Sequence, residues 1–78
     1  MERVEGRIVA IYETWPLQLA LEGPRGRIDV ALSAETAVIA GGRAVAPSDL
    51  RDGARVAIEG ETTAPGAMIA ARISILAR

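Results

Sequence analysis

Apolar and polar side chains alternate along most of this chain, in short runs that glycine and proline separate. The first run covers residues 3–13 and carries its charged side chains mainly on one parity. Runs 17–22 and 27–33 repeat the alternation, and a Gly-Pro-containing turn joins them. A period of two is typical of strands that are buried on one face, whereas amphipathic helices repeat apolar residues every three to four positions. The pattern therefore predicts an all-β protein in which the second and third runs form a hairpin.

The middle of the chain predicts smaller elements. Residues 36–46 form two short runs around Gly41-Gly42, a pair that readily adopts the positive φ of a tight turn. Residues 47–53 indicate one helical turn, in which Ser48 can cap the amino end and Gly53 can take the left-handed closing position. We therefore expect a small hairpin and then a single helical turn before the chain returns to strand.

Two further alternating runs, residues 55–60 and 68–76, predict the last two strands. Three strands, an irregular connection with a helical turn, and two more strands match the order of the five-stranded Greek-key barrel known as the OB-fold. Closure also removes the exposed strand edges that invite pairing between chains. The alternative is a six-stranded SH3-like barrel or small sandwich with residues 36–46 as a full hairpin. The side chains predicted to point inward are Val4, Ile8, Leu17, Leu19, Leu21, Ile28, Val30, Leu32, Leu50, Val56, Ile58, Ile69, Ala71, Ile73 and Ile75.

The composition predicts a thin core. The chain has 78 residues, half of them apolar, and we expect a single domain over residues 1–78. Only two residues are aromatic, and fourteen of the twenty Val, Ile and Leu residues are β-branched, which favours sheet. Because the chain has no Cys and no His, it lacks disulfides and the commonest zinc and copper ligands. Apolar packing must therefore stabilise the fold, alone or with a partner chain.

The side chains that usually carry catalysis are missing. Nucleophile and base pairs generally require His, Cys or Lys, and the sequence contains none of them. The acid pairs Glu59/Glu61 and Asp49/Asp52 do not have the spacing of a calcium loop. We therefore expect no enzymatic activity, no catalytic residue, no cofactor and no metal site. A net charge of −1 lacks the basic field expected of a nucleic-acid binder, and no apolar run is long enough for a membrane span.

Both aromatic residues fall in or beside the first predicted loop. In OB-folds this loop and the loop between the last two strands, here residues 61–66, flank the usual ligand face. Trp15 can stack on a base or a sugar there, or it can cover one open end of the thin barrel while its indole N–H reaches a carbonyl or water. The candidate ligand-binding residues are Tyr12, Trp15, Arg25, Arg27, Thr62 and Thr63.

A second candidate surface comes from the outward parity of the first and last strands. Its members are apolar, namely Val9, Ile11, Met68, Ala70 and Leu76. Small barrels use such semi-apolar edges for oligomers or for the addition of a partner's strand. An equally good interpretation is that the hairpin of residues 36–46 buries them.

Several spaced motifs extend over nearly the whole chain. They read Val4-x-Gly6-x-Ile8, Thr36-Ala37-Val38, Asp49-Leu50-x-x-Gly53-x-x-Val56-x-Ile58-x-Gly60 and Ala70-Ala71-Arg72-Ile73-Ser74-Ile75. With the paired hairpin, this pattern resembles a bacterial family of small OB-like domains for which no general activity or catalytic residue is known. The resemblance implies an OB-like barrel, and members of that family often lie in exported or envelope proteins, sometimes in tandem.

The sequence thus predicts a non-catalytic binding or assembly module. Association with a protein partner or with itself is the first hypothesis, and binding of single-stranded nucleic acid or a small ligand by the loop around Trp15 is the alternative. The sequence as written has no signal peptide. We expect a cytoplasmic location if Met1 is the native start, and an envelope or exported location if the chain is an excised domain.

Overall fold

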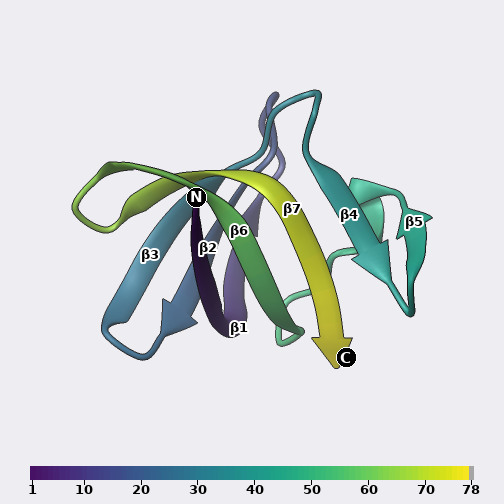
Figure 1. The fold of residues 1–78 in the computed structure, drawn as a ribbon, viewed down its shortest axis with the longest axis horizontal. Helices are drawn as coiled ribbons and strands as arrows, with labels where there is room; N and C mark the ends of the chain where they lie inside the picture. The colour runs from purple at the N-terminus through teal and green to yellow at the C-terminus, as the bar shows by residue number, and fades with distance from the viewer. Residues whose placement is uncertain (78) are drawn as a thin grey trace.

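The chain folds into a small closed β-barrel in the computed structural model, which describes residues 1–77 (Figure 1). The barrel strands are β1 (Glu2–Tyr12), β2 (Gln18–Gly23), β3 (Gly26–Ala31), β6 (Arg55–Ala64) and β7 (Ala67–Ala77). Their order is β3-β2-β1-β6-β7, and a parallel pairing between β3 and β7 closes the ring. This is the strand arrangement of an OB-like barrel, so the predicted all-β class and architecture are confirmed.

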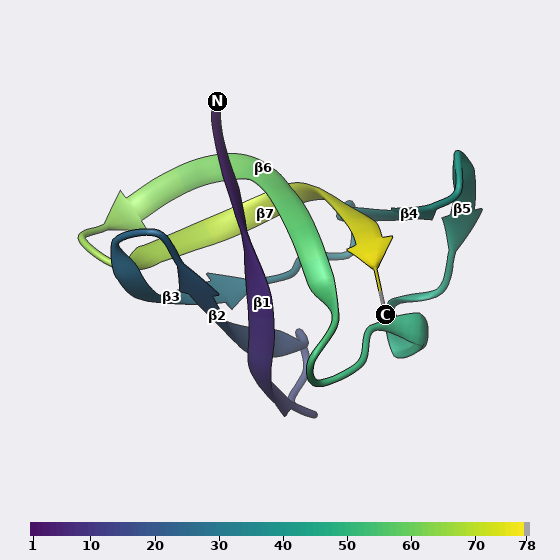
Figure 2. The ribbon, with the colours of Figure 1, turned by 90° about the horizontal axis from the view of Figure 1, so that it is seen from below.

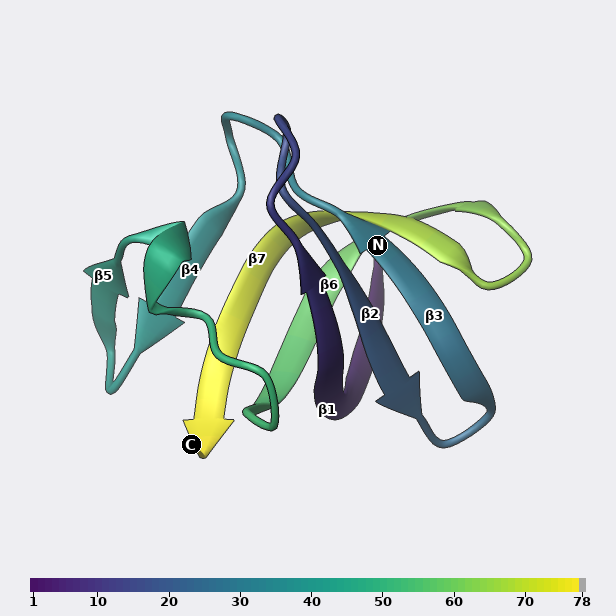
Figure 3. The same cartoon turned by 180° about the vertical axis from the view of Figure 1, so that it is seen from behind.

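The predicted small hairpin is present, and it lies outside the barrel. Strands β4 (Ala37–Ala40) and β5 (Arg43–Val45) extend the sheet beyond β7, with β4 parallel to the second half of β7 (Figures 1 and 3). Gly41 and Gly42 form its turn with φ of 58° and 78°. The hairpin therefore adds an edge to the sheet, and the five barrel strands close without it.

The predicted helical turn is a 3-10 turn over Pro47–Asp49. Gly53 has a φ of 89°, as expected for a left-handed closing residue. The prediction that Ser48 caps the turn is wrong, because the capping position is Ala46 and no side chain bonds to it. Pro47 explains the shift, since a proline at the first helical position already lacks the N–H that a cap would satisfy.

Strand β1 is shared between two parts of the barrel. Its first half pairs with β6 and its second half pairs with β2, so it belongs to both sides of the barrel (Figure 2), and Figure 1 shows the sharp bend that this requires. Gly6 lies at the bend, where an added Cβ would overlap the carbonyl oxygen of Glu22. The register shifts between Ile8 and Ala10, which leaves Val9 as a bulge. Ile11, predicted to point outward, therefore packs against the core.

A second bulge corrects the prediction for β7. Arg72 pairs with Glu59 and Ala70 pairs with Gly60, so Ala71 has no partner on β6. One extra residue reverses which side chains point inward and which point outward in the part of β7 that precedes it. Ile69 and Ala71, predicted inward, are therefore exposed, and Ala70, predicted outward, is buried. Met68, which was also predicted to point outward, is buried for the same reason, so the predicted semi-apolar strip lacks both Met68 and Ala70.

The remaining inward predictions hold. Val4, Leu17, Ile28 and Ile75 are half-buried against the core. Val38 from the hairpin and Ala54 before β6 complete it. No polar or charged side chain is buried among residues 1–77. The buried core residues among those predicted are Ile8, Leu19, Leu21, Val30, Leu32, Leu50, Val56, Ile58 and Ile73.

Candidate functional site

The candidate ligand-binding residues do not form one site. Trp15 lies in the β1–β2 loop, beside the end of β3 and the start of β7. Arg25, Arg27 and Thr62 line a groove at the barrel end where the β2–β3 and β6–β7 turns meet. Thr63 is an exposed neighbour on β6 that lines neither hollow. The surface thus has two separate candidate sites.

The first site is an apolar hollow of about 370 Å³, which we call the Trp15 face. Ala31 and Ile69 form its floor, because they are partners in the parallel pairing of β3 with β7. The hollow is lined by Trp15, Pro16, Ala31, Leu32, Ser33, Ala34 and Ile69. Ile69 is 45% exposed there, and it is exposed because of the bulge at Ala71.

Trp15 projects from this face. Its side chain is 89% exposed, so the interpretation that it covers an open end of the barrel is wrong. The loop that carries it is held at both ends: the Thr14 N–H donates to the Tyr12 carbonyl at 2.8 Å, and the Leu32 N–H donates to the Leu17 carbonyl at 2.9 Å. The Thr14 hydroxyl also donates to the carbonyl of Pro16 at 2.9 Å. The indole is therefore presented to solvent from an anchored loop.

Tyr12 is engaged with Arg27 on the outer surface of β1, β2 and β3. Arg27 Nη2 donates to the Tyr12 hydroxyl at 2.9 Å, and Arg27 Nε lies 3.4 Å from Asp29 Oδ1. The hydrogen bond to Tyr12, followed by the interaction with Asp29, raises the pKa of Arg27. Like any arginine, this guanidinium is charged at every physiological pH, and it already has two partners.

Carboxylates border the Trp15 face. Asp29 lies two residues before Ala31 on the same face of β3, and Glu61 pairs with Ile69 across β6 and β7. Glu13 lies in the loop beside Trp15. The basic side chain of β3 is Arg27, and Asp29 forms an ion pair with it. This surface has an apolar centre and a mainly acidic border, which suits an uncharged apolar contact better than a polyphosphate.

The second site, which we call the mouth groove, has a volume of about 520 Å³. It contains three arginines and two glutamates above an apolar floor. Among residues 1–77, no cluster of three or more His, Cys, Asp or Glu side chains could hold a metal ion. The residues that line the groove can form ion pairs, hydrogen bonds and apolar contacts, which are the interactions of non-covalent binding.

Sequence reasoning found Trp15 and missed the rest of its face. Pro16 and Ala31 carry no chemical signal, and the alternation of the sequence predicts that Ile69 lies in the core. The only available clue was the isolated Gly60, because glycine inside a strand often marks a bulge or a close backbone approach. An added Cβ on Gly60 would overlap the carbonyl oxygen of Ile69, the residue that the bulge turns outward.

Comparison with known proteins does not assign a function to this chain. No known protein family matches the chain, and no curated protein is significantly similar to it. The resemblance to a bacterial family of small OB-like domains therefore stays a prediction. Among residues 1–77, no helix has the length and apolar character needed to cross a membrane.

Proposed function

We propose that this protein is a non-catalytic association module that pairs with a second copy of itself through the Trp15 face. The observation that carries the proposal is the position of Trp15, an 89% exposed indole beside an apolar hollow. The surface of a monomeric protein rarely exposes a large aromatic side chain beside an apolar hollow unless a binding partner covers both.

The geometry of the face favours a second copy as the partner. A twofold interface joins the same patch on both subunits, so each patch must be complementary to itself. The Trp15 face has a projecting side chain and a recess side by side. When two copies meet about a twofold axis, each indole can enter the recess of the other chain. The contact then forms twice.

Burial of the two indoles gives a free energy of the same size as the cost of association. Burying one tryptophan removes about 150–250 Å² from water, which is worth roughly 4–6 kcal/mol at about 25 cal/mol per Å². Two such burials contribute roughly 8–12 kcal/mol, within the range of about 4–15 kcal/mol that association costs. Ile69 and Ala31 must supply the surplus. The anchored loop lowers the ordering cost, because Trp15 is already held in an exposed position.

The charges around the Trp15 face favour a protein surface over single-stranded nucleic acid as the binding partner. Stacking of a base on Trp15 remains chemically reasonable. However, the neighbouring phosphates would face Asp29 and Glu61, and Arg27, the basic residue of β3, is already paired. Binding of nucleic acid is therefore the alternative outcome of the experiment below.

Sedimentation equilibrium over a range of concentrations tests the proposal. We expect the wild-type mass to rise from the monomer value of 8.2 kDa towards twice that value. Trp15→Ala and Ile69→Arg should both keep the protein monomeric, because they remove the projecting group or place a charge on the floor of the hollow. Leu76→Arg is the matched control, since Leu76 is equally exposed at 48% but lies at the far end of β7.

Two results would contradict self-association through this face. One is a wild-type protein that stays monomeric at high concentration. The other is a dimer that Leu76→Arg disrupts and Ile69→Arg does not. If single-stranded DNA quenches Trp15 fluorescence in a salt-sensitive way and the protein stays monomeric, the nucleic-acid alternative replaces the proposal.

A further inference from the structure

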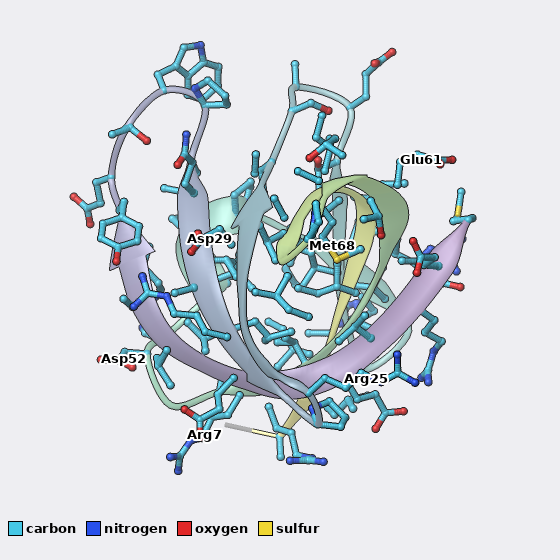
Figure 4. The ribbon with its side chains drawn as sticks, turned by 90° about the vertical axis from the view of Figure 1, so that its left-hand side faces the viewer. Arg7, Arg25, Asp29, Asp52, Glu61 and Met68 are labelled. Atoms are coloured by element: carbon cyan, nitrogen blue, oxygen red, sulfur yellow. The ribbon has the colours of Figure 1, made fainter. Side chains whose placement is uncertain are left out.

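The mouth groove lies between three segments that are distant in the sequence. Its walls are the first residues of β1, the β2–β3 turn with the start of β3, and the β6–β7 turn. Figure 4 shows Arg25 at the tip of the β2–β3 hairpin, with Met68 above it at the start of β7. The groove is open because β1 pairs with β2 only from Arg7 onward, so the first residues of β1 leave the β2–β3 hairpin.

The floor of the groove is apolar and connected to the core. Val4 and Ile28 are half-buried and pack against the core cluster, and Met68 belongs to that cluster. Ala67 adds a small side chain beside them. A volume of about 520 Å³ falls in the range of roughly 300–1,000 Å³ that is typical of small-ligand sites. An aliphatic chain of moderate length can therefore lie on this floor.

The charged groups at the rim are not equivalent. Arg3 Nη1 forms an ion pair with Glu5 Oε2 at 2.6 Å, and the Thr62 hydroxyl donates to a carboxylate oxygen of Glu2. Arg27 is engaged with Tyr12 and Asp29 outside the groove. Within the described part of the chain, Arg25 has no ion-pair partner. One guanidinium is thus left to receive an anion at the edge of an apolar floor.

We propose that the mouth groove binds an aliphatic carboxylate, with the carboxylate on Arg25 and the apolar chain on Val4, Ile28 and Met68. The guanidinium can hold a carboxylate through two parallel N–H donors, a geometry that favours carboxylate over a neutral headgroup. Both a free fatty acid and the free carboxyl end of a peptide with an apolar last residue have this chemistry. The site is separate from the Trp15 face and does not depend on self-association.

Backbone chemical-shift titrations with sodium octanoate, and with a short peptide acid ending in leucine, test this site. The Ile69→Arg variant, designed not to pair, should be used so that changes report on one chain. We expect shifts confined to residues 2–5, 24–28, 62 and 66–68. Octan-1-ol and the corresponding peptide amide should bind at least about tenfold more weakly, because each lacks the charge that Arg25 receives.

Substitution of the arginine provides a second test. Arg25→Gln should weaken octanoate binding by about tenfold, whereas Arg43→Gln, on the distant β5 edge, should leave it unchanged. If only octanoate binds, the ligand is a fatty acid, and if only the peptide acid binds, it is a chain end. Equal binding of octanoate and octan-1-ol, full affinity in Arg25→Gln, or no shift in the groove with either acid would overturn the proposal.

Discussion

Replacing Met68 and Ile69 one at a time with alanine tests the inverted parity of β7. The two residues are neighbours with aliphatic side chains of similar size, yet Met68 is 3% exposed and Ile69 is 45% exposed. Truncating a buried methionine generally costs about 2–5 kcal/mol, because it removes apolar burial and leaves a cavity. Truncating a half-exposed isoleucine should cost about 1 kcal/mol or less. We therefore expect Met68→Ala to be the more destabilising change by at least about 1 kcal/mol.

Urea unfolding followed by far-ultraviolet circular dichroism measures the difference. A chain of this length has a total stability of roughly 4–12 kcal/mol, so a loss near the lower estimate leaves the variant folded. At about 4–8 °C per kcal/mol, Met68→Ala should also lower Tm by about 10 °C or more. The protein must be dilute, because Ile69 belongs to the face proposed to pair. Equal losses would contradict the bulge at Ala71, and a larger loss for Ile69→Ala would restore the simple alternation.

Two further substitutions test close contacts that the same bulges and turns create. Gly60→Ala should lower the free energy of unfolding in urea by at least about 1–3 kcal/mol, because the added Cβ would overlap backbone atoms of Ile69. Gly23→Ala is the control. Its added Cβ would have its nearest neighbours at 3.4 Å or beyond, so its stability should stay within about 0.5 kcal/mol of wild type. A neutral Gly60→Ala would contradict the close approach of β6 and β7. Thr36→Val should cost about 1–3 kcal/mol, because the Thr36 hydroxyl donates to the Ala70 carbonyl at 2.6 Å and accepts from the Ser33 N–H at 2.8 Å. The exposed Thr63→Val is its control, and equal effects from the two would argue against a structural role for the Thr36 hydroxyl.

The alternation of the sequence was sufficient to predict the barrel, because a strand buried on one face has a period of two wherever its pairing is regular. Thus Leu19, Leu21 and Val30 lie in the core as expected. The same rule failed at Ile69, because it cannot detect an extra residue within a strand. A bulge is decided by how two distant strands fit together, here the approach of Gly60 to the backbone of Ile69.

The candidate site was harder to predict than the fold. Trp15 could be identified because an aromatic in an OB-fold loop is chemically conspicuous. Its role as a cover for the barrel could not be rejected, since the exposure of a loop residue depends on the path of the loop. The groups that complete each surface are also determined by topology: Ile69 joins Trp15 through the closure of β3 on β7, and Arg25 joins Val4 through the curvature of β1.

The fluorescence of Trp15 across a dilution series gives the most direct test of self-association through the Trp15 face. The chain has a single tryptophan, so the emission reports one position. The account predicts emission at the wavelength of a water-exposed indole in dilute solution, and a shift to shorter wavelength over the concentration range in which the mass doubles. If the mass doubles while the emission stays that of an exposed indole, the two copies meet on another surface and the assignment of the Trp15 face is wrong.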